Sequence, residues 1–278
     1  MQHSETNIAN RIEVIDVLRG FALLGICLRH FISRFDYSNG THSYDFSLSG
    51  FDRFVEYLDY HFLIDKTYPI FALLFGFSIY LVDRSSTGNV SARSYKRLLG
   101  LIPFACLNAA FFPAGDILGL YAMVGLFTLL LVKLPLKWLP YIVVFFLLQP
   151  LLSIQIAINL LGGSLSVISY NSSSYMKEVE SAITNGNFLN IIWTNLTKGQ
   201  IGDFLWALEV GRVSQTIGLI LLGFYLGKSG RFVVFIERGR RNLPYLIIPA
   251  LVIIGSKVLG KYFIDTPVTK EAALLLSN

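Results

Sequence analysis

The stretch DVLRGFALLGICLRH, residues 16–30, carries two side chains whose types and spacing suit acyl transfer. Arg19 and His30 are eleven residues apart, so in a helix they share one face and lie about 16 Å apart along its axis. Histidine takes and gives a proton near neutral pH, and arginine pairs with phosphate groups. Acyl transfer needs a base for the acceptor hydroxyl and groups that stabilise developing negative charge. These properties make His30 the best candidate on this helix for a proton-transferring group, with Arg19 on the same face.

The same stretch has a plainer structural interpretation. Asp16 and Arg19 are three residues apart, which favours an ion pair where the helix begins. Arg29 and Arg34 would then extend toward the membrane surface, and His30 would be a buried polar residue with its hydrogen bonds satisfied. Spacing alone does not separate this interpretation from the catalytic one.

The composition predicts a helical membrane protein. The chain has 278 residues, of which 15% are charged, and a mean hydropathy of +0.58. An ordinary soluble domain is about one quarter charged, and a transmembrane helix needs about 20 apolar residues. We therefore expect an all-α bundle in a single integral membrane domain over residues 1–278. Seven apolar segments are the predicted spans, at 17–35, 64–82, 98–114, 117–133, 138–161, 207–227 and 243–263.

The distribution of charge predicts the orientation of these spans. Basic residues gather in the connections 83–97, 133–137 and 228–241, whereas 36–65 is acidic and 162–205 is polar. By the positive-inside rule the N-terminus is cytoplasmic, and 162–205 is an outer loop that holds a short interfacial helix. The chain has a net charge of +5, and its Lys and Arg residues cluster beside the apolar segments. This position favours membrane lipids over nucleic acid as the partner.

Four stretches resemble a bacterial membrane family. The run RIEVIDVLRGFALLGI resembles the start of the YeiB-like proteins (domain of unknown function 418). The runs YPIFALLFGFSIYL at 68–81, GDILGLYAMVGL at 115–126 and GLILLGFYLGKSG at 218–230 are similar to later motifs of that family. The resemblance implies a multi-pass protein of the bacterial inner membrane. Members of the family usually continue into a Gly-Pro-x-Glu-type motif, which does not follow residue 263, so a shortened relative is expected.

The YeiB-like family is similar in turn to membrane acyltransferases of the type-3 and heparan-alpha-glucosaminide N-acetyltransferase families. Type-3 enzymes carry an Arg, ten residues and a His in their first helix, which Arg19 and His30 match. YeiB-like proteins often have Asn at the His position. The resemblance implies that Arg19 helps to hold an acyl-coenzyme A donor. It also implies that His30 activates a hydroxyl on an envelope glycan, a lipid or a small molecule.

Four further residues are candidates for the same site. Asp116 begins a predicted helix, where a carboxylate caps backbone N–H groups, but it would also be placed to orient the imidazole of His30. Tyr121 would face the same cavity. Glu209 and Arg212 are three residues apart, which favours an ion pair, and they are second candidates for binding the substrate.

Other classes of site have less support. Asp59, His61 and Asp65 lie within seven residues, but no second ligand cluster accompanies them, so an acidic interfacial segment is favoured and no metal is predicted. Nucleotide-binding and hydrolase motifs are absent from the sequence. Two alternatives to the acyltransferase stay open. One is a transporter of a small solute or a proton-coupled carrier, and the other is a non-catalytic membrane partner protein.

Overall fold

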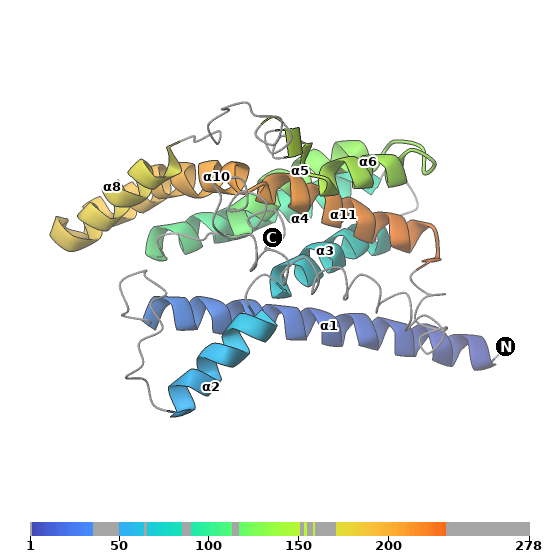
Figure 1. Ribbon diagram of the computed structural model, residues 1–278. Helices are drawn as coiled ribbons and strands as arrows, with labels where there is room; N and C mark the ends of the chain where they lie inside the picture. The colour runs from blue at the N-terminus through green and yellow to red at the C-terminus, as the bar shows by residue number, and fades with distance from the viewer. Residues whose placement is uncertain are drawn as a thin grey trace. The chain divides into compact units, whose positions relative to one another are not determined.

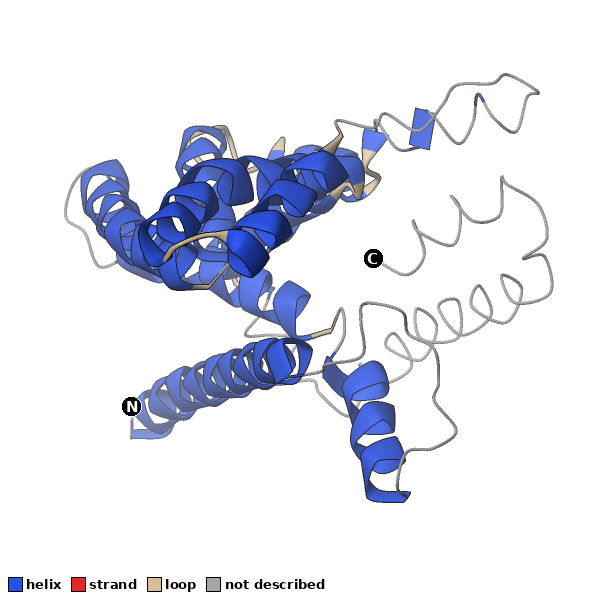
Figure 2. Cartoon of the chain, turned by 90° about the vertical axis from the view of Figure 1, so that its left-hand side faces the viewer, coloured by secondary structure: helices blue, strands red, loops and turns tan. Residues whose placement is uncertain are grey.

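The protein is built from helices, as the composition predicts. The computed structural model describes residues 2–35, 50–63, 66–84, 90–112, 117–150, 153–154, 158 and 171–231. Within these ranges the regular structure is helical and no strand occurs (Figure 2). The all-α prediction is therefore confirmed. The chain divides into an N-terminal unit, Met1–Phe75, and a C-terminal unit, Gly76–Asn278.

The N-terminal unit is organised along one long helix, α1 (Gln2–Phe35) (Figure 1). It is followed by α2 (Gly50–Leu58), the short π-helix η1 (Asp59–Leu63) and the first turns of α3 (Thr67–Arg84). One face of α1 is buried around Ile15 and Ala22, which are 4% and 0% exposed. The helix starts well before residue 17, where the apolar run begins.

A glycine on α1 permits a close contact inside this unit. A Cβ added at Gly25 would lie 2.3 Å from Cγ2 of Thr67, the first residue of α3. At Gly20 an added Cβ would meet nothing within 4 Å. Small residues let two helices approach closely. Of the two glycines, Gly25 lies at such a contact and Gly20 does not.

The core of the C-terminal unit is formed by α4 (Val90–Phe111), α5 (Ile117–Leu131), α6 (Leu139–Leu147) and α11 (Arg212–Lys228). The second part of α3 packs on α11, because a Cβ at Gly76 would lie 1.8 Å from the carbonyl oxygen of Ile220. About one turn further along, the ring of Tyr80 meets the ring of Phe224 edge to face, with centroids 6.4 Å apart. The most deeply buried large side chains lie on α5, α6 and α11, and they include Tyr121, Leu129, Leu139, Ile220, Leu221 and Phe224.

The predicted outer loop 162–205 holds more helix than the sequence indicated. From Ser172 onward it contains α8 (Ser172–Asn185), α9 (Phe188–Thr194), the π-helix η2 (Asn195–Gly199) and the start of α10 (Gln200–Glu209). α8 lies beside α10 (Figure 1). η2 is fixed to α4 by the side chain of Asn195, which is 2% exposed and donates to the carbonyl oxygen of Ala110 at 3.1 Å.

Within the described ranges, fewer helices reach membrane-crossing length than the seven predicted spans require. Among the described residues one helical stretch, His61–Arg84, is long and apolar enough to cross a membrane. A second candidate is the pair Phe188–Glu209 and Arg212–Lys228, which is bent by 76° at its break. The nine residues of α6 cover about 14 Å, less than half of a hydrocarbon core about 30 Å thick. The seven-span arrangement is therefore not confirmed. Its last span, 243–263, and part of 138–161 lie outside the described residues.

Candidate functional site

A partly buried ion pair joins α1 to η1 beside His30. Arg29 Nη1 lies 2.8 Å from Asp59 Oδ2, and the Asp59 side chain is 7% exposed while that of Arg29 is 32% exposed. A carboxylate at this depth is stable because a charge-assisted hydrogen bond replaces its lost water. The sequence favoured an outward-pointing Arg29 and did not predict this pair. The sequence features that could have indicated the pair are Arg29 inside an apolar run and the acidic segment 36–65 that follows it.

Arg19 and His30 lie on the half-buried face of α1, as their spacing predicts. Both have intermediate exposure, whereas Leu24, which points away from them, is 58% exposed. Arg19 Nη1 is 3.0 Å from Asp16 Oδ1, so the predicted ion pair at positions 16 and 19 is confirmed. An exposed pair of this kind contributes about 0–1 kcal/mol, so an anionic ligand can compete with Asp16 for the guanidinium.

Two side chains of the DYHFLID segment, those of Asp59 and His61, have partners in the structure. Nδ1 of His61 lies 2.9 Å from the carbonyl oxygen of Tyr57, and the two rings stack with centroids 4.0 Å apart. Asp59 is paired with Arg29. Asp65 lies outside the described residues. In the part of the chain that the structure describes, no three His, Cys, Asp or Glu side chains gather as metal ligands would.

The structure gives Glu209 and Arg212, which the sequence favoured as an ion pair, contacts with Ser172 and Trp206. The Glu209 carboxylate accepts hydrogen bonds from the backbone N–H of Ser172, at 3.2 Å, and from the Ser172 hydroxyl. It thus caps α8, whose preceding residue Asn171 makes no side-chain cap. The guanidinium of Arg212 lies 5.5 Å from the centre of the Trp206 ring, within cation–π range.

Replacing Glu209 by Ala is expected to lower the free energy of unfolding by about 1–2 kcal/mol, because α8 loses its capping acceptor. Hydrogen exchange of the amides of α8 should report the loss, with the first turn of that helix exchanging faster. Glu180→Ala is the matched control, since Glu180 is exposed on α8 and makes no side-chain hydrogen bond or ion pair within the described ranges. Equal exchange in both variants would contradict the capping role.

The predicted site residues are divided between the two units of the chain. Tyr121 is 1% exposed inside α5, within the core of the C-terminal unit. Asp116 lies outside the described residues. Arg19 and His30 belong to the N-terminal unit, whereas Tyr121 and the Glu209–Arg212 segment belong to the C-terminal unit. A cavity shared by all of them therefore stays a prediction.

Part of the chain is similar to a bacterial protein. Neither a protein-family model nor a solved structure matches the chain. Over 123 residues the chain is 37% identical to the "Uncharacterized 39.9 kDa protein in amylase 3'region" of Bacillus acidopullulyticus. The alignment covers 43% of this chain and 33% of that protein, so the chain spans about a third of the length of the curated relative it matches.

Proposed function

We propose that this protein is a membrane O-acyltransferase. It would move an acetyl or other acyl group from coenzyme A to a hydroxyl of an envelope glycan, a lipid or a small molecule. The observation that carries the proposal is the placement of Arg19 and His30 on one half-buried face of a single uninterrupted helix. That placement supplies a cation for the donor phosphates and a base deeper along the same face.

The chemistry follows from these two groups. His30 removes the proton from the acceptor hydroxyl as its oxygen attacks the thioester carbonyl carbon. The carbon–sulfur bond then breaks, and the coenzyme A thiolate takes the proton back from the imidazolium. Arg19 exchanges its exposed partner Asp16 for a donor phosphate. The Arg29–Asp59 pair holds α1 against η1 at the residue next to the base, so it is a positioning element.

The proposal includes the finer features expected from the sequence. They are membership of the YeiB-like family, a seven-span inner-membrane topology with a cytoplasmic N-terminus, and roles for Asp116, Tyr121, Glu209 and Arg212 around the acceptor. The four motifs and the alternation of basic and acidic connections support them.

A transporter of a small solute or a proton-coupled carrier is the second candidate, favoured by the broken helix of the C-terminal unit. α10 and α11 are bent by 76° around Val210 and Gly211, and Gly211 has φ 71°, a conformation that glycine adopts without strain. Discontinuous helices of this kind form ion and solute sites in secondary transporters. A non-catalytic membrane partner is the remaining alternative, in which His30 would be dispensable.

Acetyl-coenzyme A binding tests the acyltransferase. The protein purified in mild detergent should gain about 2.7 kcal/mol of stability at a donor concentration 100 times the Kd. Arg19→Ala should abolish this gain. His30→Ala should keep it but lower the rate of thioester consumption by about 100-fold or more.

Two control variants remove an arginine or a histidine outside the proposed site. Arg97 is exposed on α4 and His61 is exposed on η1, so Arg97→Ala and His61→Ala should leave both readouts unchanged. If the folded wild type shows no stabilisation, the donor assignment is wrong. A pH-dependent solute flux through liposomes that is lost in His30→Ala would then support the carrier.

A further inference from the structure

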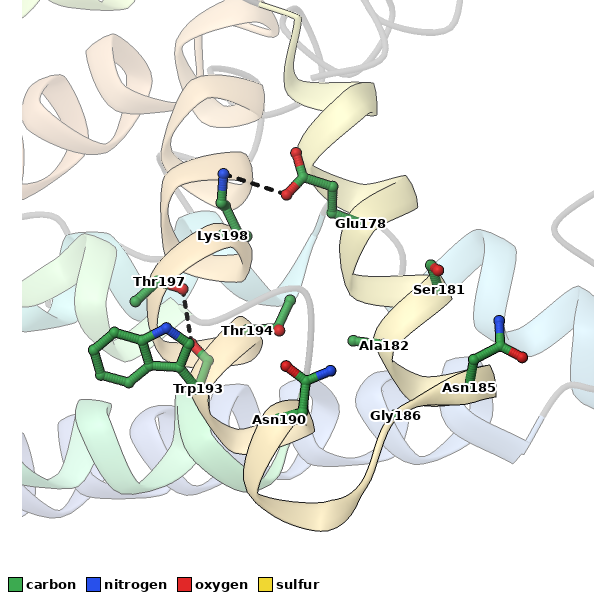
Figure 3. Close-up of a pocket in the computed structure, with 10 residues that line it drawn as sticks. All are labelled: Glu178, Ser181, Ala182, Asn185, Gly186, Asn190, Trp193, Thr194, Thr197 and Lys198. Carbon is green, nitrogen blue, oxygen red and sulfur yellow. Dashed lines mark hydrogen bonds and ion pairs between the residues drawn. The ribbon is translucent and has the colours of Figure 1, made fainter.

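A pocket lies between α8 and the continuous segment formed by α9 and η2. Its volume is about 400 Å³, which is within the range of sites for small molecules. Figure 3 shows Asn190 and Thr194 of the α9 segment turned toward Ala182 of α8, with Gly186 in the connection below them. The pocket belongs entirely to the C-terminal unit and contains none of the predicted acyl-transfer residues.

The charges at the pocket cancel each other. Lys198 Nζ lies 3.3 Å from Glu178 Oε2 across the gap between η2 and α8 (Figure 3). These are the ionisable side chains among the lining residues. The two side chains are 45% and 51% exposed, so a phosphate or carboxylate could displace Glu178 at little cost, but it would find no second cation among those residues. The wall therefore favours an uncharged ligand.

Four other polar side chains in the wall of the pocket are available for hydrogen bonds to a ligand. The side chains of Ser181, Asn185, Asn190 and Thr194 make no hydrogen bond to another residue in the described part of the chain. An asparagine amide has both donors and an acceptor, and a hydroxyl both donates and accepts. Two amides and two hydroxyls around one opening match a ligand that carries several hydroxyl groups.

An exposed apolar face borders these polar groups. The Trp193 side chain lines the edge of the pocket and is 68% exposed, and Phe188 and Leu189 on the same short helix are 65% and 74% exposed. At about 100° per residue Trp193 lies about 60° from Asn190 and about 40° from Leu189 on α9, so its ring stands between the polar side chains and Leu189, with Phe188 about 100° further round. An indole ring adds a flat apolar surface and one N–H donor to a polar site.

We propose that this pocket binds a neutral saccharide, as a free glycan or as the headgroup of a glycolipid. The amides and hydroxyls would bind sugar hydroxyls, and Trp193 would contact an apolar ring face. The Glu178–Lys198 pair leaves the wall without net charge, so a charged sugar would gain no net attraction there. The site goes beyond acyl transfer, and it stands whether or not the protein uses coenzyme A. In the glycolipid form the chains of the lipid would lie along Phe188 and Leu189.

Binding of the purified full-length chain to an array of neutral and acidic oligosaccharides tests the proposal. We expect neutral glycans to be bound in preference to sialylated or sulfated ones. Asn190→Ala and Trp193→Ala should each weaken that binding at least 10-fold. Trp138→Ala and Glu180→Ala are matched controls, because both residues are exposed and neither lines the pocket, and they should bind as the wild type does.

A second arm separates the two sources of the sugar. Nanodiscs that contain digalactosyldiacylglycerol are compared with free digalactose, using wild type and Leu189→Ser. A glycolipid ligand predicts stronger binding to the nanodisc and a loss in Leu189→Ser, whereas a free glycan predicts equal binding and no loss. The proposal is overturned if folded wild type binds no neutral glycan in either arm. It is equally overturned if Asn190→Ala and Trp193→Ala, with unchanged melting temperatures, bind as well as wild type.

Discussion

Replacing Gly76 by Ala is expected to destabilise the protein by about 3 kcal/mol, which lowers the melting temperature by roughly 6–12 °C. The added Cβ would lie 1.8 Å from the carbonyl oxygen of Ile220 and 2.6 Å from its carbonyl carbon. Both atoms belong to the backbone of α11, and Ile220 is 0% exposed, so no flexible side chain can move aside. The contact is relieved only when α3 and α11 separate. Thermal unfolding in mild detergent measures the effect.

Gly100→Ala is the matched control for this substitution. Gly100 also lies inside a helix, α4, but an added Cβ there would meet nothing within 4 Å. Alanine in an open helical position stabilises by about 0.5–1 kcal/mol. The two variants should therefore shift the melting temperature in opposite directions. Equal shifts would show that α3 does not pack closely on α11.

The helical class was predictable from the sequence because it follows from long apolar runs. The run at 117–133 coincides closely with α5, and the run at 98–114 covers the C-terminal part of α4, which begins eight residues earlier. α8 was not predictable in the same way, because its sequence SSSYMKEVESAITN has few apolar residues and a serine-rich start. The helix is stabilised by tertiary contacts, including the Glu209 cap, and local propensity does not report them.

The candidate site was predictable only where it depends on helical spacing. Arg19 and His30 share a face because they are eleven residues apart. Asp16 pairs with Arg19 because they are three residues apart. The contact of Arg29 with Asp59 joins residues thirty positions apart. This contact depends on where η1 places the Asp59 side chain, and local sequence patterns do not predict that position. The same holds for the pocket between α8 and α9.

Replacing Arg29 by Met is expected to cost about 2–4 kcal/mol, measured as a fall in the free energy of unfolding. Methionine has a similar length to the apolar part of the arginine side chain. The fall in the free energy of unfolding therefore reports the loss of the positive charge. The Asp59 carboxylate, 7% exposed, would remain in a site that water reaches poorly, without the guanidinium now at 2.8 Å. The expected loss is below that of a fully buried pair because the Arg29 side chain is 32% exposed.

Arg19→Met on the same helix is a closely matched control. Its side chain is also 32% exposed and its ion pair is 3.0 Å long, but its partner Asp16 is 60% exposed and would be rehydrated when the guanidinium is removed. The loss there should stay below about 1 kcal/mol. Adding Asp59→Asn to Arg29→Met should recover part of the stability, since the stranded charge disappears. If Arg29→Met costs no more than Arg19→Met, the pair does not hold α1 against η1. His30 would then need another support on its helix to act as a base.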